Sequence, residues 1–193
     1  MDYFNEKERV QQKKFASYRD KCLKYIIVFF VKNNLSKNSA SFIGVCFLFL
    51  ACLLNPFEYY WIIALCLFFY LFFDAIDGGI ARYTKTANEN GSVIDIICDQ
   101  LGVVFLTASA VYFYQVDSIA SLLYANSYIA FIILVVYLNQ RNINTFPFLR
   151  VKYIFYILYL ISPFIGVFFI EFFICFFAVY YIVMFIIFMK YLI

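Results

Sequence analysis

Four aspartates lie in two pairs along one segment of the chain, Asp74 with Asp77 and Asp95 with Asp99. Spacings of three and four residues place each pair on one face of a helix. Both pairs lie at or inside hydrophobic segments long enough to cross a bilayer, where a carboxylate costs roughly 2.5–3.5 kcal/mol, so they require a compensating cation or a function. Oxygen-only ligands suit Mg²⁺ or Mn²⁺, and two such ions would balance the four charges. Two-metal sites typically drive phosphoryl displacement.

The residues between the two pairs indicate that an anion binds there. Gly78 and Gly79 leave the backbone bare, so a ligand can approach it closely. Arg82 follows about one helical turn later, and a guanidinium beside bound metal ions is explained if a phosphate lies between them. Lys85 can add positive charge, and Gly91 leaves room for substrate or a neighbouring helix. The pattern therefore predicts a metal-phosphate site.

Membrane-spanning helices have to position these groups. The chain has 193 residues, of which 66% are hydrophobic and 14% are charged, whereas soluble domains are about half apolar and a quarter charged. A spanning helix needs about 20 mostly apolar residues. We therefore predict an all-α integral membrane protein with six transmembrane helices, and we place the last two as separate helices joined by a hairpin around Glu171. The predicted spans are residues 39–54, 57–73, 92–114, 119–138, 151–169 and 172–189.

The distribution of lysine and arginine predicts the orientation of these spans. Most of the 15 basic residues precede Ser39. The others lie between the second and third spans, between the fourth and fifth, and at the C-terminus, while the alternate connections contain none. The positive-inside rule then puts both termini and the four aspartates in the cytoplasm. A bacterial inner membrane is the expected location, and an organelle membrane is the alternative.

Residues 1–38 form a predicted cytoplasmic segment, and residues 39–193 form the membrane domain. Phe15, Tyr18, Cys22, Tyr25 and Phe29 recur at three- or four-residue steps, which predicts an amphipathic juxtamembrane helix on the inner membrane surface. Its basic residues are expected to meet anionic lipid headgroups, not nucleic acid. The six cysteines form no CxxC pair and the chain has no histidine, so zinc sites, haem ligation and histidine-based triads are not expected.

The segment that contains the aspartates resembles the signature of the CDP-alcohol phosphatidyltransferase family, Asp-x2-Asp-Gly-x2-Ala-Arg-x8-Gly-x3-Asp-x3-Asp. Every fixed position is present, as Asp74, Asp77, Gly78, Ala81, Arg82, Gly91, Asp95 and Asp99. A weaker match to the family's Pro-Asn-x-x-Thr-x-x-Gly lies at Asn38, Ser41 and Gly44, with Lys37 where proline is usual. Gln100 stands where many relatives carry a basic residue, a departure that concerns either the acceptor or the dimer contact.

The resemblance implies a six-helix membrane enzyme, usually a homodimer, that transfers a substituted phosphate from a CDP-alcohol to an acceptor hydroxyl and releases CMP. It implies that the four aspartates hold the metal ions and that Asp99 is also the general base. The implied CDP-alcohol contacts are Gly78, Ala81, Arg82 and Gly91, with Asn38, Ser41 and Lys85 as weaker candidates.

Three basic residues, Arg141, Arg150 and Lys152, lie between the fourth and fifth spans. Relatives that use phosphorylated acceptors carry basic residues in this area. The resemblance therefore favours CDP-diacylglycerol as donor and an anionic acceptor of the inositol phosphate or glycerol phosphate type. Alternatively, the three residues are topology anchors that extend to lipid headgroups.

Two other functions remain open at this point. The first is transfer from CDP-choline or CDP-ethanolamine to diacylglycerol. The second is a divalent-cation transporter, because intramembrane carboxylates can mark a cation path. The acids lie only at the cytoplasmic ends of the predicted spans, with Arg82 among them, an arrangement that disfavours a path through the membrane.

Overall fold

The computed structural model describes residues 6–86, 89–141, 143 and 145–192. All regular structure in these residues is helical, which confirms the all-α prediction for the described part of the chain. The elements are α1 (Glu6–Cys22), α2 (Lys24–Lys32), α3 (Lys37–Leu53), α4 (Tyr60–Tyr83), α5 (Glu89–Ser109), the π-helical turn η1 (Ala110–Tyr114), α6 (Ser118–Gln140), α7 (Lys152–Ile165) and α8 (Phe168–Met189).

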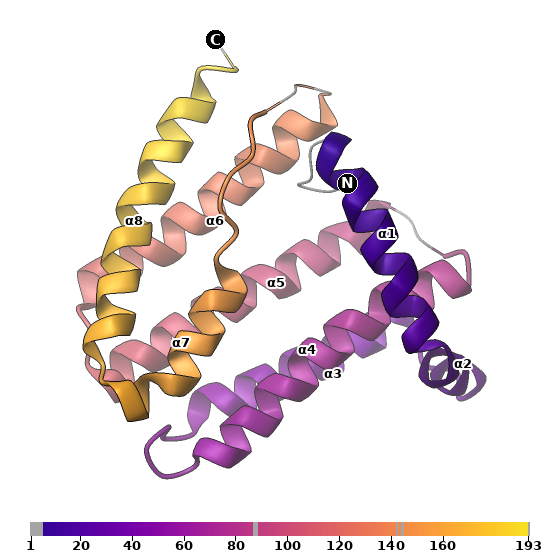
Figure 1. Ribbon diagram of the computed structural model, residues 1–193, viewed down its shortest axis with the longest axis horizontal. Coiled ribbons are helices and arrows are strands. Elements are labelled where there is room, and N and C mark those ends of the chain that lie inside the picture. The colour runs from indigo at the N-terminus through magenta and orange to yellow at the C-terminus, as the bar shows by residue number, and fades with distance from the viewer. Residues whose placement is uncertain (1–5, 87–88, 142, 144, 193) are drawn as a thin grey trace.

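The helices pack as two main pairs around α5 (Figure 1). Helix α3 packs along α4 on one side, and α6 packs along α8 on the other. Helices α3 and α4 approach closely at Gly44, where a Cβ would lie 3.3 Å from the Cβ of Phe73 and make a tight contact. Helix α5 contacts α3, α6 and α7. The second and third predicted spans therefore lie in one bundle with their charged ends together.

Four helices of the described chain are long and apolar enough to cross a membrane: Tyr60–Tyr83, Val93–Tyr114, Ser118–Gln140 and Phe168–Met189. The pair α2 and α3, bent by 106°, gives a fifth candidate when counted as one span. Helix α7 is apolar but only 14 residues long. The protein is an integral membrane protein, and each predicted span has a helix, but the count of six transmembrane helices is not confirmed.

The turn between the last two predicted spans lies earlier than expected. Helix α7 ends at Ile165 because Gly166 has a φ of +100°, a backbone conformation that favours glycine. Glu171, where the hairpin was predicted, lies instead in the first turn of α8. The prediction was wrong here because glutamate is tolerated in the first turn of a helix, where the helix dipole favours an acidic side chain.

The juxtamembrane segment forms two helices that meet at Leu23. The predicted apolar face lies on the outside, with Phe15 62% and Tyr25 87% exposed. Helix α2 packs on the other side, where Ile27 is buried against Ile76 and Ile80 of α4. A surface helix with an exposed aromatic face suits the membrane interface.

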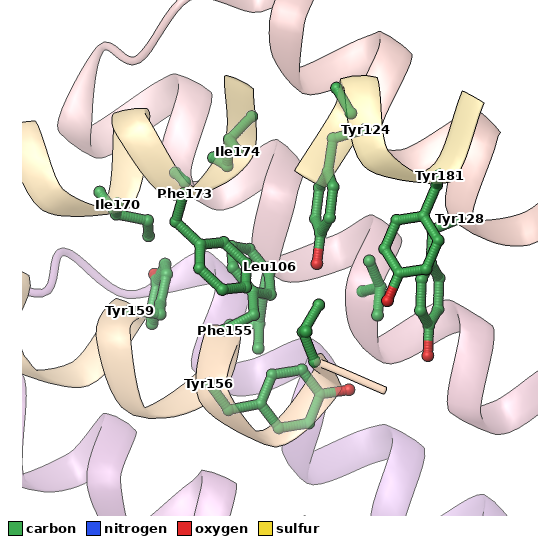
Figure 2. Close-up of a cluster of buried hydrophobic side chains, with 14 of the residues drawn as sticks. Leu106, Tyr124, Tyr128, Phe155, Tyr156, Tyr159, Ile170, Phe173, Ile174 and Tyr181 are labelled. Carbon is green, nitrogen blue, oxygen red and sulfur yellow. The ribbon is translucent and has the colours of Figure 1, made fainter. Parts of the chain in front are cut away.

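The main hydrophobic core includes aromatic side chains that join α5, α6, α7 and α8 (Figure 2). Tyr124, Phe155, Tyr159 and Tyr181 are fully buried. The hydroxyl of Tyr159 lies 2.6 Å from the hydroxyl of Ser109, so this buried polar group has a partner. This packing fixes the position of α7 against α5, and with it the position of the residues at the start of α7.

Candidate active site

The two helices that carry the aspartates bring the pairs together across their interface. Asp74 and Asp77 lie on α4, and Asp95 and Asp99 lie on α5. The carboxyl group of Asp74 lies within hydrogen-bonding reach of Asp99, and that of Asp95 within reach of Asp77. The structure therefore assembles all four predicted aspartates into one cluster.

The first two turns of α3 supply partners for two of these carboxylates. The hydroxyl of Ser41 donates a hydrogen bond to Oδ2 of Asp77 at 2.5 Å, and Asp77 is buried. Nζ of Lys37 lies 3.5 Å from Oδ2 of Asp95. Lys37 and Ser41 are four residues apart, so both face the cluster from one side of α3. Ser41 thus holds an aspartate, and its predicted contact with the CDP-alcohol stays a prediction.

Lys152 reaches the cluster from the start of α7. Its ammonium group donates to Oδ1 of Asp99 at 2.5 Å, and the residue is only 5% exposed. The ammonium also lies 5.0 Å from the ring centre of Tyr153 and 5.9 Å from that of Tyr70. A buried charge needs such a partner, because an unpaired ion in a low-dielectric interior is strongly unfavourable.

The chain enters α7 along a non-helical segment that α8 holds in place. The backbone N–H of Leu149 donates to the hydroxyl of Tyr180 at 2.9 Å, and the hydroxyl of Tyr181 donates to the Leu149 carbonyl at 3.0 Å. Backbone groups outside a helix need hydrogen-bond partners from other parts of the protein where water does not reach them. These two hydrogen bonds meet that need and set the register that directs Lys152 inward.

Arg82 lies at the end of α4 and binds the juxtamembrane helix. Its Nε and Nη2 donate to the two carboxylate oxygens of Asp20 at 2.6 and 2.7 Å. Arg19 approaches from α1, with its Nε 3.9 Å from Oδ1 of Asp20. Both arginines also lie over Gly78, where a Cβ would be 3.2 Å from Nη1 of Arg82 and 3.3 Å from Nη2 of Arg19.

The other residues predicted to contact the CDP-alcohol differ in their exposure to solvent. Ala81 is buried in α4, whereas Asn38 is exposed in the first turn of α3, whose N-cap is Ser36. Lys85 is exposed in the turn after α4, with a left-handed φ of 56°. Gly91 lies within α5, but its surroundings lie outside the part of the chain that the structure describes.

The predicted acceptor residues separate in the structure. Lys152 joins the aspartate cluster, as described above. Arg141 is exposed at the end of α6, with its guanidinium 4.9 Å from the ring centre of Tyr137. The guanidinium of Arg150 lies 5.1 Å from the ring centre of Phe148. Cation–π contacts of this kind suit charges held at a membrane surface.

The cluster fits a hard divalent cation by the chemistry of its donors. All four acidic side chains offer only oxygen, the ligand that Mg²⁺ and Mn²⁺ prefer. Among the described residues, no three acidic or cysteine side chains converge closely enough to form a metal-binding group. Lys37 and Lys152 neutralise Asp95 and Asp99 in this arrangement. The donor set thus agrees with the predicted metal, and the two-ion count stays a prediction.

Sequence reasoning missed the contacts made by Arg19, Asp20 and Lys37. Lys37 was noticed only as a departure from the usual proline, although its helical spacing to Ser41 placed it on the same face. Asp20 and Arg19 lie far from Arg82 in the sequence, in a segment whose pattern indicated only a membrane-surface helix. No local signal connects them.

Comparison with known proteins identifies the family. No curated protein sequence gives a significant match. The fold is similar to the crystal structure of phosphatidylinositol phosphate synthase from Mycobacterium tuberculosis in complex with manganese and citrate, with a TM-score of 0.71, 17% identity and coverage of 86% of each chain. The sequence model of the CDP-alcohol phosphatidyltransferase family matches residues 33–191. This match covers most of the chain and includes all four aspartates, and the protein belongs to the CDP-alcohol phosphatidyltransferase family.

Proposed function

We propose that this protein transfers a substituted phosphate from CDP-diacylglycerol to the hydroxyl of an anionic acceptor alcohol and releases CMP. The acceptor class is inositol phosphate or glycerol phosphate. The observation that carries the proposal is the convergence of two aspartate pairs with Lys152 on one side. The fold of phosphatidylinositol phosphate synthase supports the same reaction class. We further propose a homodimer in a bacterial inner membrane, with the site and both termini cytoplasmic.

The four aspartates would hold two divalent ions, Mg²⁺ or Mn²⁺. When bound, such ions neutralise the diphosphate and stabilise the CMP leaving group. Ser41 orients the buried carboxylate of Asp77 through its hydrogen bond. Groups that orient a metal ligand in this way tune its affinity for the metal. The manganese in the crystal structure of phosphatidylinositol phosphate synthase agrees with this choice of ion.

Asp99 is the proposed general base. In this mechanism its carboxylate accepts the proton from the acceptor hydroxyl as the acceptor oxygen attacks the phosphorus. The new phosphorus–oxygen bond forms while the bond to the CMP oxygen breaks, and CMP leaves with that electron pair. Lys152 donates to Oδ1 of Asp99, and this contact orients the carboxylate.

Lys152 also supports an anionic acceptor. Its ammonium group donates to Oδ1 of Asp99, the proposed general base. A buried ammonium beside the base attracts a negatively charged acceptor in a region of low dielectric. Arg141 is exposed and its guanidinium lies over the ring of Tyr137, which favours a role as a topology anchor for this residue. Transfer from CDP-choline or CDP-ethanolamine to diacylglycerol gives no reason for this lysine.

A panel of donors and acceptors tests the proposed function. Purified full-length protein in nanodiscs is mixed with CDP-diacylglycerol, CDP-choline or CDP-ethanolamine and with inositol phosphate, glycerol phosphate, inositol or diacylglycerol, and CMP release is measured. We expect CMP only with CDP-diacylglycerol and a phosphorylated acceptor, and only with Mg²⁺ or Mn²⁺ present. Release with CDP-choline and diacylglycerol would overturn the donor assignment. Metal uptake into proteoliposomes without CMP release would identify a transporter.

A further inference from the structure

Two arginines from different helices meet over the backbone of Gly78. Arg19 comes from α1 and Arg82 from the end of α4, and one amino group of each lies within 3.3 Å of the point that a Cβ of Gly78 would occupy. Like charges this close repel each other. Gly78 has no side chain to fill this space, so its backbone and both guanidinium groups border the same volume.

One carboxylate only partly compensates this pair. Asp20 accepts both of its short hydrogen bonds from Nε and Nη2 of Arg82, which leaves Nη1 of Arg82 directed at Gly78. Asp20 lies 3.9 Å from Nε of Arg19, which is too long for a hydrogen bond. Nε of Arg19 is shielded from solvent and has no hydrogen-bond partner in the described structure. A buried donor without a partner is costly and indicates a missing acceptor.

Gly78 directly follows Asp77 in α4, so the two guanidinium groups lie beside the helical turn that carries an aspartate of the cluster. The carboxylate cluster and the two arginines are therefore parts of one polar region. A site that combines oxygen ligands for metal ions with two guanidinium groups suits a diphosphate. The diphosphate oxygens can bind the metal ions and accept hydrogen bonds from the guanidinium groups.

We propose that Arg19 of the juxtamembrane helix is a further binding residue for the diphosphate of the CDP-alcohol donor, acting together with Arg82 across Gly78. This inference rests on the proposed function, because that function supplies the diphosphate. Asp20 holds Arg82 in the orientation that leaves its Nη1 free for the ligand. Helix α1 is then more than a membrane anchor, because it completes the donor site of the helical bundle.

Equilibrium binding of CDP tests this role directly. The full-length protein in phosphatidylcholine nanodiscs with Mn²⁺ is titrated with CDP, for wild type, Arg19→Ala, Arg19→Lys and Arg82→Ala. We expect Arg19→Ala to weaken CDP binding about tenfold or more, the effect of one lost charge-assisted hydrogen bond. Arg19→Lys keeps the positive charge but lacks the paired N–H donors of the planar guanidinium, so it should recover only part of the affinity. Lys21→Ala is the matched control, since it removes an exposed charge from the same helix and should change the affinity less than twofold.

The double variant Arg19→Ala/Arg82→Ala separates shared binding from a structural effect. If both arginines bind one diphosphate, the losses in affinity combine non-additively. Melting temperatures measured without CDP show whether Arg19→Ala is folded, and Arg19→Lys replaces it if it is not. Additive losses with a large decrease in melting temperature would overturn the proposal in favour of a packing role. Wild-type protein that does not bind CDP would also overturn it.

A lipid phosphate is the other source of the same anion. The titrations are therefore repeated in nanodiscs that contain phosphatidylglycerol. An effect of Arg19→Ala that appears only with this anionic lipid would assign Arg19 to a headgroup and overturn the proposal. The proposed function fails on a different result. In that case the wild type binds CDP and Arg19→Ala weakens the binding, but no CDP-alcohol yields CMP. If wild type releases CMP and Arg19→Ala leaves both CDP affinity and the donor KM unchanged, only the role of Arg19 fails.

Discussion

The ammonium group of Lys152 and the carboxylate of Asp99 form a buried ion pair that joins α7 to α5 at the candidate active site. Both side chains are shielded from solvent, with exposed fractions of 7% and 15%. Screening is weak there, so each charge depends on the other. The pair therefore couples the packing of α7 to the orientation of the proposed general base.

Replacing Lys152 with methionine tests this coupling. We expect kcat to fall at least tenfold and the KM for a phosphorylated acceptor to rise, because the variant removes both the partner of Asp99 and a cation beside the acceptor. Steady-state CMP release at varied acceptor concentration measures both constants. The control is Lys190→Met, an exposed lysine after α8, which should leave them unchanged. A rise in KM with an unchanged kcat would show that Lys152 binds the acceptor without positioning Asp99.

Replacing Asp99 with asparagine tests the general base. Asparagine keeps the size of the side chain but cannot take up the proton, so we expect kcat to fall about 10²- to 10⁴-fold. Binding of CDP should stay within a few-fold of wild type, because the other three aspartates and Arg82 remain. The control is Glu58→Gln, because Glu58 is exposed and lies just before the start of α4, at the opposite end of that helix from the aspartates. Near-normal CMP release by Asp99→Asn would remove Asp99 from this role.

Replacing Ser41 with alanine tests the support of Asp77. The variant leaves a buried carboxylate without its hydroxyl donor, which costs about 1–3 kcal/mol of unfolding free energy. We also expect the Mn²⁺ concentration for half-maximal activity to rise about 10- to 100-fold. Ser127→Ala, which removes a hydroxyl from α6 away from the cluster, is the matched control. An unchanged metal dependence together with a higher donor KM would instead support the contact with the CDP-alcohol predicted from the sequence.

Removal of the metal tests the charge balance of the whole cluster. Among the residues that the structure describes, Lys37 pairs with Asp95 and Lys152 pairs with Asp99, while the cluster holds four carboxylates. Dialysis against EDTA should therefore abolish CMP release and lower the melting temperature, and Mg²⁺ or Mn²⁺ should restore both, since a ligand that binds only the folded state stabilises it. Ca²⁺ at the same concentration controls for ionic strength. Full activity after chelation would contradict a metal-dependent reaction.

Local patterns predicted the helices and the aspartate pairs well. Hydrophobic length defines a membrane helix because the bilayer forces backbone groups to pair within it, and so each predicted span corresponds to a helix. The spacing within each pair, such as Asp74 with Asp77, follows directly from helical geometry. The boundary near Gly166 was missed because both a helix and a turn accept the surrounding apolar residues, and only the glycine's left-handed φ decides between them.

The partners of the aspartates could not be predicted, because they depend on how separate helices dock. Lys152 was noticed as one of three basic residues in a connection, and nothing in that stretch distinguishes it from Arg141 or Arg150. The structure places the ammonium group of Lys152 on Asp99, at the start of a helix whose entry is held by hydrogen bonds between Leu149 and the hydroxyls of Tyr180 and Tyr181. The meeting of Asp20 with Arg82 likewise follows from the docking of α1, which is a tertiary event.

The packing beneath the site gives a last prediction, at Gly102 of α5. A Cβ at this position would overlap the hydroxyl oxygen of Tyr156 and lie 2.8 Å from that of Tyr70. Both rings are buried and rigid, so Gly102→Ala should lower the unfolding free energy by about 1–3 kcal/mol, measured by thermal or denaturant unfolding in detergent. Tyr156→Phe removes the overlapping hydroxyl, and the double variant should recover part of the loss. If it recovers none, the steric contact between α5 and α7 is not what requires glycine at position 102.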